Sequence, residues 1–534
     1  MINNVKQSSQ KKSKILLIQL YGQAQPPDAE PLSIEVLKSA VLFENQETKV
    51  NLEIVDSRNK QRDLERICTS LSLSSFLVIG ISAPQSTFNL SFDVIRALYK
   101  EDVEANIVVG HALPSYSPEL YLYTFSKIIV VRGWGEESFV QLIKYFNHGS
   151  PKLKFIPNLC YTEEKNIIHK TKITWPVKIY KPLRLNSNSY FHRIEASRGC
   201  HYNTCTYCTH PPEDICQKIT WFPRPISDVL EEVNIIKASG NPVFTFTDAD
   251  FVGNDVSRAM EIANKLIEIG GLNFSISVRA DQVINPYGRD FENANRRQLF
   301  ERLKKAGLHL MFVGIESLSD SQLTRYCKGI TAETNIKAVR IIEQIGVCLE
   351  IGFILFDPFL TKEELITNLK KLEQTGMWKH SGQIINPFRP QKGSSYLRML
   401  KKHGILTNYN KENMSYHASF LDSDICEIFT VCRNWLKEFD KIYLLVRNFQ
   451  RSKKYSGIYN HYILAMRLLL FSLVKAVAET KLIKRRNIDQ KMFSPFNIKR
   501  EQLISDIYYS LCKNSTLTKT EIELKKECQL YFNT

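Results

Sequence analysis

Three cysteines stand close together near the middle of the chain. Cys200, Cys205 and Cys208 follow the pattern C-x4-C-x2-C, with Gly199 before the first and Tyr207 before the third. Three thiolates at this spacing can hold three irons of a [4Fe–4S] cluster, because such clusters are held by cysteine thiolates. The fourth iron would have no ligand from this segment, and an open position on a metal can bind a small molecule.

Two simpler interpretations use the same cysteines. His210 would complete a Cys3His zinc site. Cys216 would instead supply a fourth thiolate and close a structural cluster. Short cysteine spacings are shared by several kinds of metal site, so the spacing alone leaves these alternatives open.

The segment from residue 191 to about residue 403 should position these cysteines. It alternates short apolar runs with amphipathic patterns, which predicts six strand–helix pairs. The expected strands are His192–Ser197, Val243–Thr247, Phe274–Val278, Leu310–Ile315, Leu349–Phe356 and Gln383–Asn386. Repeated strand–helix units favour a parallel TIM-type barrel or partial barrel, whose chemistry lies at the carboxyl ends of the strands. The cysteines follow the first strand, where the site of such a barrel is expected.

Polar side chains follow the other expected strands at the same end. They are Thr247, Asp248 and Asp250, then Ser277, Arg279 and Asp281, then Glu316, Asp357 and Arg389. Charged groups are costly to bury without a partner, so these side chains should face a polar ligand or one another. Each one alone is explained equally well by a salt bridge in a loop, but their gathering at one end of consecutive strands favours a site.

The first 147 residues show a second α/β pattern. Five apolar runs alternate with helical patterns, at Lys14–Leu20, Val50–Asp56, Phe76–Ser82, Ala105–His111 and Lys127–Arg132. This pattern predicts a Rossmann-like domain, an open parallel sheet with helices on both faces. Ligands of such sheets bind at the carboxyl ends of the strands, where Ser82, Gly110 and the segment Gly133–Glu136 stand. No G-x-G-x-x-G follows the first strand, so a nicotinamide or flavin dinucleotide is not supported.

The remaining parts of the chain carry no motif for chemistry. Residues 148–190 are predicted to link the first domain to the barrel at residues 191–407, and residues 408–534 to form a helical region. The apolar run Tyr462–Lys475 is interrupted by Arg467 and is shorter than the roughly 20 residues of a membrane span. We therefore predict a core helix there and no transmembrane segment.

The charge of the chain is uneven. The formal net charge is +16, and residues 441–534 alone hold 18 Lys and Arg against 7 Asp and Glu. Such a region can face nucleic acid, anionic lipid or an acidic peptide. A solvated face of a helical domain explains it more simply, so a nucleic-acid partner is not expected.

Composition indicates a folded protein of several domains. The chain has 534 residues, of which 43% are hydrophobic and 24% charged, as in soluble globular proteins. Its 12 cysteines, in a chain of this length, do not indicate a disulfide framework. The first ten residues lack the apolar stretch of a signal peptide. We therefore expect a reducing, cytoplasmic environment.

Taken in order, these motifs resemble the radical S-adenosylmethionine (SAM) family over residues 190–400. The matching segments are Cys200–Cys208, Thr247–Asp250, Ser277–Asp281, Leu303–Ser317, Lys328–Thr331 and Gly352–Pro358. The first domain resembles the cobalamin-binding domain that precedes many radical enzymes. The D-x-H-x-x-G that supplies a cobalt-ligating histidine in part of that family is absent, which implies cobalamin without this ligand. The x4 gap is similar to that of radical SAM proteins that mature ribosomally made peptides.

The resemblance also implies roles for particular residues. SAM would bind the fourth iron through its amino and carboxylate groups, and an electron from the cluster would cleave it to a 5′-deoxyadenosyl radical. Tyr207 is expected at the adenine, Thr247 and Asp248 at the amino group, Ser277 and Glu316 at the ribose or methionine, Arg279 at the carboxylate, and Ser82 and Gly110 at cobalamin. An external electron donor such as flavodoxin or ferredoxin is implied as a partner.

Three functions remain as hypotheses. The first is cobalamin-dependent methylation of a carbon in a peptide or other natural product, with methylcobalamin as the donor. The second keeps radical SAM chemistry but replaces methylation with rearrangement, cyclisation or crosslinking. The third is an iron–sulfur or zinc protein without catalysis.

Overall fold

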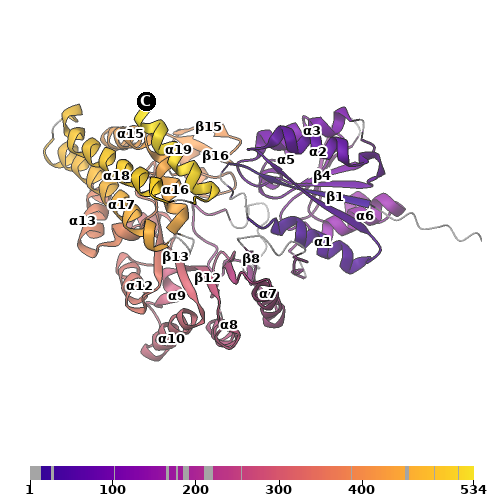
Figure 1. Cartoon of the computed structure of the whole chain (residues 1–534), viewed down its shortest axis with the longest axis horizontal. Helices are drawn as coiled ribbons and strands as arrows, with labels where there is room; N and C mark the ends of the chain where they lie inside the picture. Colours follow the sequence, from indigo (N-terminus) through magenta and orange to yellow (C-terminus); the bar gives the residue numbers. More distant parts are fainter. Residues whose placement is uncertain are drawn as a thin grey trace, which may run out of the picture.

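The chain folds into two α/β units and a helical region, which Figure 1 shows with the first unit at the right and the helical region at the upper left. The structure is a computed structural model. It describes residues 14–533 apart from residues 24, 26–28, 102, 164–166, 176–177, 185–191, 210–220, 254, 387, 451–455, 486 and 515.

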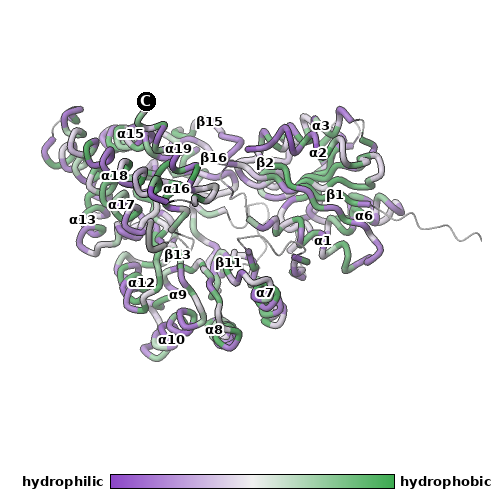
Figure 2. The backbone as a smooth tube through the Cα atoms, in the orientation of Figure 1, coloured by the Kyte–Doolittle hydropathy of each residue, from purple (hydrophilic) through white to green (hydrophobic). Residues whose placement is uncertain are grey.

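The first unit is built on a sheet whose first five strands are parallel. In chain order they are β1 Lys14–Tyr21, β2 Lys49–Asp56, β3 Val78–Ser82, β4 Asn106–Gly110 and β5 Ile129–Val131, arranged as β2-β1-β3-β4-β5. All five predicted strands are confirmed to within two residues at each end. Figure 2 shows β1 as a hydrophobic segment inside the unit, and β1 and β3 are buried along nearly their whole length, as expected for a parallel sheet buried on both faces.

Helices cover both faces of this sheet. One face packs against α1 Leu32–Glu44 and α6 Glu136–His148. The other packs against α2 Lys60–Ser70, α3 Phe88–Lys100 and α5 Pro118–Leu122, which follows the short helix α4 Ala112–Tyr116. The predicted Rossmann-like architecture is therefore present.

Two further strands extend the first sheet from within the segment predicted as a link. They are β6 Leu159–Thr162 and β7 Ile168–Lys170, and both pair antiparallel beyond β5. Leu159 and Tyr161 pack into one core of the unit, while Cys160 between them packs into the other. This alternation is the period-2 pattern of a strand buried on both faces.

The second unit contains a sheet of five parallel strands, which lie side by side in the order in which they occur along the chain. They are β8 His192–Ile194, β11 Val243–Phe246, β12 Asn273–Arg279, β13 Leu308–Glu316 and β14 Cys348–Phe353. The main helices between and after them are α7 Ile226–Ala238, α8 Val256–Ile269, α10 Asp290–Ala306, α12 Ala332–Ile345 and α13 Lys362–Thr375. Short helices α9 Ala280–Val283 and α11 Asp320–Arg325 follow β12 and β13.

The sixth predicted strand, Gln383–Asn386, is wrong. Among the described residues of this region, the only β-bridge to the sheet is an isolated one between Ser381 and Ile351. The segment forms a turn in which the Asn386 N–H donates to the Gln383 carbonyl at 3.1 Å. Ile384 and Ile385 are both buried, as neighbours can be in a turn or in a strand that is covered on both faces. A short apolar run does not distinguish these two conformations.

The first barrel strand is shorter than the predicted His192–Ser197. Strand β8 ends at Ile194, and the chain then forms β9 Ser197–Gly199, which pairs antiparallel with β10 Trp221–Pro223. This two-stranded ribbon leads directly into the three cysteines.

The helical region packs on the barrel through a shared core. Its main helices are α15 Ser423–Lys437, α16 Asp440–Gln450, α17 Ser456–Ala478, α18 Ser494–Cys512 and α19 Lys519–Asn533. The predicted core helix is confirmed, because Met466, Leu470 and Val474 of α17 are fully buried. None of the described helices combines the length and the hydropathy that crossing a membrane requires.

A β-hairpin precedes these helices and reaches back to the first unit. It pairs β15 Leu406–Asn410 with β16 Ser415–Ala418, so residues 408–418 are not part of the predicted helical region. Both carboxylate oxygens of Glu412 accept hydrogen bonds at the start of α3, from the backbone N–H groups of Phe88 and Asn89 at 2.9 and 2.8 Å. The hairpin therefore connects the two α/β units.

Candidate active site

The three cysteines lie on one loop at the carboxyl ends of the barrel strands. This cysteine loop, residues 200–209, follows Gly199, whose φ of +84° suits glycine. The Cys208 N–H donates to the Cys205 carbonyl at 3.1 Å, which folds the last part of the loop into a turn. None of the three cysteines forms a disulfide, Cys208 is exposed, and the other two are half-buried.

The start of the loop is fixed by residues that follow two other strands, Asp250 after β11 and Gln282 on α9 after β12. Nδ1 of His201 lies 2.8 Å from the carboxylate of Asp250, and the Gln282 amide lies 3.2 Å from Nε2 of the same ring. Asp250 is fully buried beyond β11. Burial and the nearby Asp250 raise the pKa of the Cys200 thiol, so a cationic partner is needed to favour its thiolate.

A cation stands beside the second cysteine. Nη1 of Arg279, the last residue of β12, donates to Sγ of Cys205 at 3.6 Å. Its other donors are directed to Asp281 and to the Lys328 carbonyl. The thiolate of Cys205 is therefore matched with a buried positive charge.

The middle of the loop is held by a buried carboxylate network. The backbone N–H of Thr206 donates to the Tyr326 carbonyl at 2.9 Å, and its carbonyl accepts from the Tyr396 N–H at 2.8 Å. The hydroxyls of both tyrosines donate to Asp357, at 2.8 and 2.6 Å. Asp357 is fully buried and also pairs with Arg325 at 3.0 Å. Asp357, which the sequence predicted at a strand end, thus holds the loop in place through Tyr326 and Tyr396.

Tyr207 lies over a second charged pair. Nζ of Lys328 is 3.2 Å from the Tyr207 hydroxyl and 3.5 Å from Oε1 of Glu316. Burial and Glu316 raise the pKa of Tyr207, so the phenol is neutral. Glu316 has a φ of +67° at an irregularity between β13 and β14, which turns its side chain toward this group. Tyr207 and Glu316, both predicted at the site, are therefore brought together.

The end of the loop contacts the first unit. The hydroxyl of Tyr116, on α4 after strand β4, donates to the Thr209 carbonyl at 2.5 Å. Arg198, two residues before Cys200, donates to Glu136 of the first unit at 2.5 Å. Glu136 begins α6 directly after the Gly133–Gly135 turn. The carboxyl ends of the strands of the first sheet and those of the barrel strands thus meet at the cysteine loop. No pattern in the sequence indicates this contact.

Other predicted site residues have partners inside the protein. Asp248 is buried and accepts from the Ala196 N–H at 3.1 Å and from the Ser197 hydroxyl. Burial raises the pKa of Asp248 to about 7. Ser82 is buried with its hydroxyl 2.9 Å from that of Ser33.

Thr247 and Ser277 are more accessible. Thr247 is exposed, and its hydroxyl donates to the Ile194 carbonyl at 3.2 Å. Ser277 is half-buried, and its carbonyl accepts from the Phe251 N–H at 2.9 Å. Thr247 directly follows β11, the neighbour of β8, and Ser277 lies near the end of β12, the next strand of the sheet.

At Gly110 the protein itself leaves room for a Cβ atom. An added Cβ would meet only Val131, at 3.6 Å from its carbonyl oxygen and 3.9 Å from its Cβ. At Gly22, by contrast, a Cβ would lie 2.3 Å from the Ser86 carbonyl oxygen. Packing therefore requires glycine at residue 22 but not at residue 110.

Two further residues are candidate metal ligands in the sequence, and one other cluster of ligand atoms lies at Cys200. His210 and Cys216 lie outside the described residues. Ligand atoms of Cys200, His201 and Asp250 lie within 4.8 Å of one another. The short contact between His201 and Asp250 is that of a hydrogen-bonded pair, which accounts for the proximity of two of these three.

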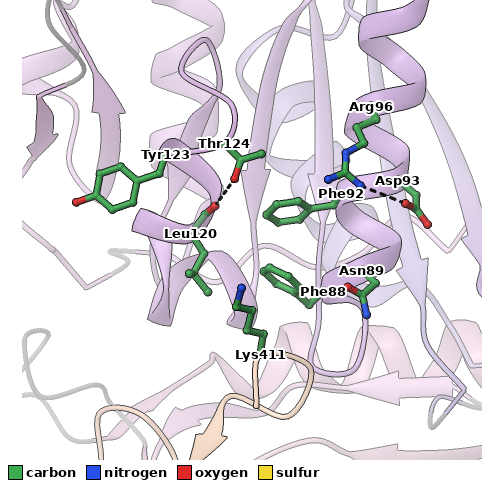
Figure 3. A pocket seen from close by; sticks show the side chains of 9 residues that line it. All are labelled: Phe88, Asn89, Phe92, Asp93, Arg96, Leu120, Tyr123, Thr124 and Lys411. Atoms are coloured by element: carbon green, nitrogen blue, oxygen red, sulfur yellow. Dashed lines mark hydrogen bonds and ion pairs between the residues drawn. The ribbon is translucent and has the colours of Figure 1, made fainter. Parts of the chain in front are cut away.

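A separate cavity of about 330 Å³ opens on the first unit (Figure 3). Helix α3, the region around α5, and Lys411 of the hairpin line it, through Phe88, Asn89, Phe92, Asp93, Arg96, Leu120, Tyr123, Thr124 and Lys411. Its lining includes none of the predicted cofactor residues, so it is distinct from the cysteine loop.

The barrel matches a known family. Residues 194–372 match the family model of the Radical SAM superfamily. This segment includes the cysteine loop and strands β11 to β14. This part of the chain is a radical SAM domain.

Curated relatives extend the similarity beyond this domain. The 4′-phospho-dehydrooxetanocin synthase of Priestia megaterium is 29% identical over 361 residues, which are 63% of this chain and 47% of that protein. An uncharacterized methyltransferase of Pyrococcus horikoshii is 25% identical over 353 residues, 64% of this chain and 72% of that protein. The chain thus matches about half the length of the synthase.

Solved structures share the fold of both units. The cobalamin-dependent SAM radical enzyme OxsB with aqua-cobalamin bound has a TM-score of 0.81 at 20% identity, covering 98% of this chain and 84% of that one. The radical SAM methyltransferase TsrM from Kitasatospora setae has a TM-score of 0.57 at 16% identity, covering 74% and 78%. Nearly the whole chain therefore has the fold of OxsB.

Proposed function

We propose that this chain is a cobalamin-dependent radical SAM enzyme that methylates a carbon atom of a peptide or other natural-product substrate. The observation that carries the proposal is the meeting of two strand-end regions at one loop. Tyr116, after β4 of the first sheet, bonds to Thr209 beside Cys208. A ligand at the carboxyl ends of the first sheet would therefore lie next to the cysteine loop.

The residues present fit the implied groups. Cys200, Cys205 and Cys208 lie on one loop without disulfides and are the donor set of a [4Fe–4S] cluster with one open iron. Arg279 supplies positive charge beside Cys205. Gly110 has no side chain at the end of β4, and the protein leaves room there for a Cβ atom, which suits the close approach of a large flat ligand such as cobalamin.

When bound, the cluster supplies the electron that cleaves SAM to a 5′-deoxyadenosyl radical, and cobalamin supplies a methyl group. The protein's contribution is orientation. Its buried networks fix both ends and the middle of the cysteine loop, while Tyr207, Lys328 and Glu316 form one wall beside the cysteines. Because the donors around the loop already have fixed partners, little rearrangement is needed when the groups bind.

Rearrangement of the substrate without methyl transfer is the second candidate. The relative with 29% identity is named a synthase, whereas the relative with 25% identity is named a methyltransferase. Both candidates use the same cysteine loop and the same first unit. They differ in the products formed from SAM, because only methylation yields S-adenosylhomocysteine.

We further propose that the protein works in the cytoplasm with an electron donor such as flavodoxin or ferredoxin. A cluster of this kind needs a one-electron reductant, and free thiols persist in a reducing compartment. The exposed position of Cys208 supports access of such a donor to the loop.

The test is anaerobic reconstitution with iron, sulfide and hydroxocobalamin, followed by SAM and dithionite. Methylation predicts S-adenosylhomocysteine among the products, together with transfer of labelled methyl groups to the substrate. Rearrangement predicts 5′-deoxyadenosine or recovered SAM with no S-adenosylhomocysteine. Failure to retain cobalamin, with the cluster intact, would remove the first candidate and leave radical chemistry that does not use cobalamin.

A further inference from the structure

Arg279 is held more tightly than a ligand-binding arginine needs to be. Its Nε and Nη2 donate to the two carboxylate oxygens of Asp281, each at 2.9 Å. Nη2 also donates to the Lys328 carbonyl at 2.9 Å, and Nη1 donates to Sγ of Cys205 at 3.6 Å. The side chain is almost fully buried. Four of the five N–H donors of this guanidinium therefore have partners.

An aromatic ring fixes the plane of the same guanidinium. Cζ of Arg279 lies 3.7 Å from the centroid of the Tyr202 ring, a cation–π contact. Tyr202 belongs to the cysteine loop, and its hydroxyl donates to the Cys327 carbonyl at 2.9 Å. At Gly329 an added Cβ would lie 2.1 Å from this hydroxyl. The glycine of the Lys328–Gly329 motif thus makes room for the ring that holds Arg279.

These contacts argue against the role that the sequence predicted for Arg279. Recognition of a carboxylate by arginine is strongest when two parallel N–H groups face two oxygens. That face of Arg279 already binds Asp281. Binding the SAM carboxylate in the same way would break the pair with Asp281 and the stacking on Tyr202.

We propose that Arg279 is a positioning residue that donates an N–H···S hydrogen bond to the cluster ligand Cys205 and thereby raises the reduction potential of the cluster. Sγ of Cys205 stands here for the thiolate sulfur bound to iron. Reduction adds one electron to the cluster, and a fixed positive charge next to a ligand sulfur stabilises the more negative state. Hydrogen bonds to cluster sulfurs are among the features that set these potentials. The inference rests on the proposed function, because it requires the cluster.

The experiment compares wild-type protein with R279K and R279Q after anaerobic reconstitution. Iron and sulfide are counted first. The midpoint potential of the one-electron couple is then measured by titration with dithionite and mediators, followed by EPR of the reduced cluster. The dissociation constant for SAM is measured by equilibrium dialysis. The matched control is R302Q, because Arg302 is exposed on α10 of the same domain and bonds to Asn264.

The expected result is an ordered shift of the potential. R279Q should be the hardest to reduce, R279K intermediate because it keeps the charge but not the planar donor, and R302Q equal to wild type. The affinity for SAM should fall by less than about tenfold, the loss that deletion of a charged hydrogen bond to the ligand would cause.

Other results overturn the inference. An unchanged potential with a loss of SAM affinity above tenfold would make Arg279 the carboxylate ligand. Loss of the cluster from both Arg279 variants, with R302Q fully loaded, would make Arg279 a requirement for assembly rather than a determinant of potential. If R279Q alone fails to bind the cluster, the potential and the SAM affinity of R279K decide between these results. If wild-type protein itself assembles no cluster, the proposed function fails before this comparison is made.

Discussion

The carboxyl ends of the two sheets differ in what fills them. In the barrel, charged side chains follow nearly every strand, and most are bonded to the cysteine loop or to the residues that support it, as Asp250, Arg279 and Asp357 are. In the first sheet, small residues stand at or just after the ends of β3, β4 and β5, namely Ser82, Gly110 and Gly133.

The difference indicates two ways of building a cofactor site. The barrel uses polar residues to hold one loop in one conformation, so its functional groups are supported by bonds within the protein. The first sheet uses small residues to leave space, as at Gly110, where only Val131 would touch an added Cβ. Changes in the two regions should therefore have separable effects.

The largest expected effect is in the barrel. We expect C205A to abolish cluster binding, because three thiolates are the only cysteine ligands that the loop offers, while cobalamin binding by the first unit is retained. Iron and sulfide analysis with absorption spectra measures the first property, and cobalamin retained after gel filtration measures the second. C426A is the matched control, because Cys426 is an exposed thiol on α15. Parallel loss of both cofactors would show that the two regions are not independent.

The reciprocal change is in the first sheet. G110L should prevent retention of cobalamin and leave the iron content unchanged, because a branched side chain would occupy the space at the end of β4. G110A should fold normally, since its Cβ would make only ordinary contacts with Val131. Full cobalamin retention by G110L would place the ligand elsewhere.

A smaller effect is expected at Asp357, the buried carboxylate whose network holds the cysteine loop. D357N weakens the hydrogen bonds from Tyr326 and Tyr396 and leaves Arg325 with Glu364 as its remaining carboxylate partner. We expect destabilisation by about 3 kcal/mol, since hydrogen bonds to a buried charge are being removed.

D357N should also contain less iron per chain, because Thr206 is held by the backbone of the same two tyrosines. Urea unfolding and iron analysis measure both quantities, with Y396F as the milder variant. D506N is the control, because Asp506 is exposed on α18. Destabilisation with normal iron content would confine the network to a role in folding.

The smallest effect concerns the hairpin that joins the two regions. Removing the carboxylate in E412A leaves two N–H groups at the start of α3 without their acceptor. The expected cost is about 1 kcal/mol, as for the loss of a helix cap. Urea unfolding should show it, with E501A on α18 as a surface control. An unchanged midpoint would mean that water replaces Glu412 without loss.

The sequence predicted the strands of the first sheet well because strands buried on both faces are nearly continuous apolar runs with turns between them. It failed at Gln383–Asn386, where two buried isoleucines suit a turn as well as a strand. It also did not predict that the short strands of the expected link, β6 and β7, extend the first sheet, since such short strands carry little periodicity.

At the site, the sequence predicted which residues gather at the strand ends but not which of them bind one another. Asp248 and Arg279 were both expected to contact SAM. In the fold, Asp248 accepts from Ala196 and Ser197, and Arg279 is divided between Asp281 and Cys205. Such pairings depend on distances between strands, which no local pattern encodes. The contact between Arg198 and Glu136 across the two units is of the same kind.

The most direct test of the account is the release of 5′-deoxyadenosine from SAM. Reconstituted protein treated anaerobically with dithionite and SAM is analysed by liquid chromatography and mass spectrometry. The account predicts 5′-deoxyadenosine from the wild-type protein and none from C205A. Wild-type protein with a complete cluster and bound SAM that releases no 5′-deoxyadenosine, with or without cobalamin, would contradict it.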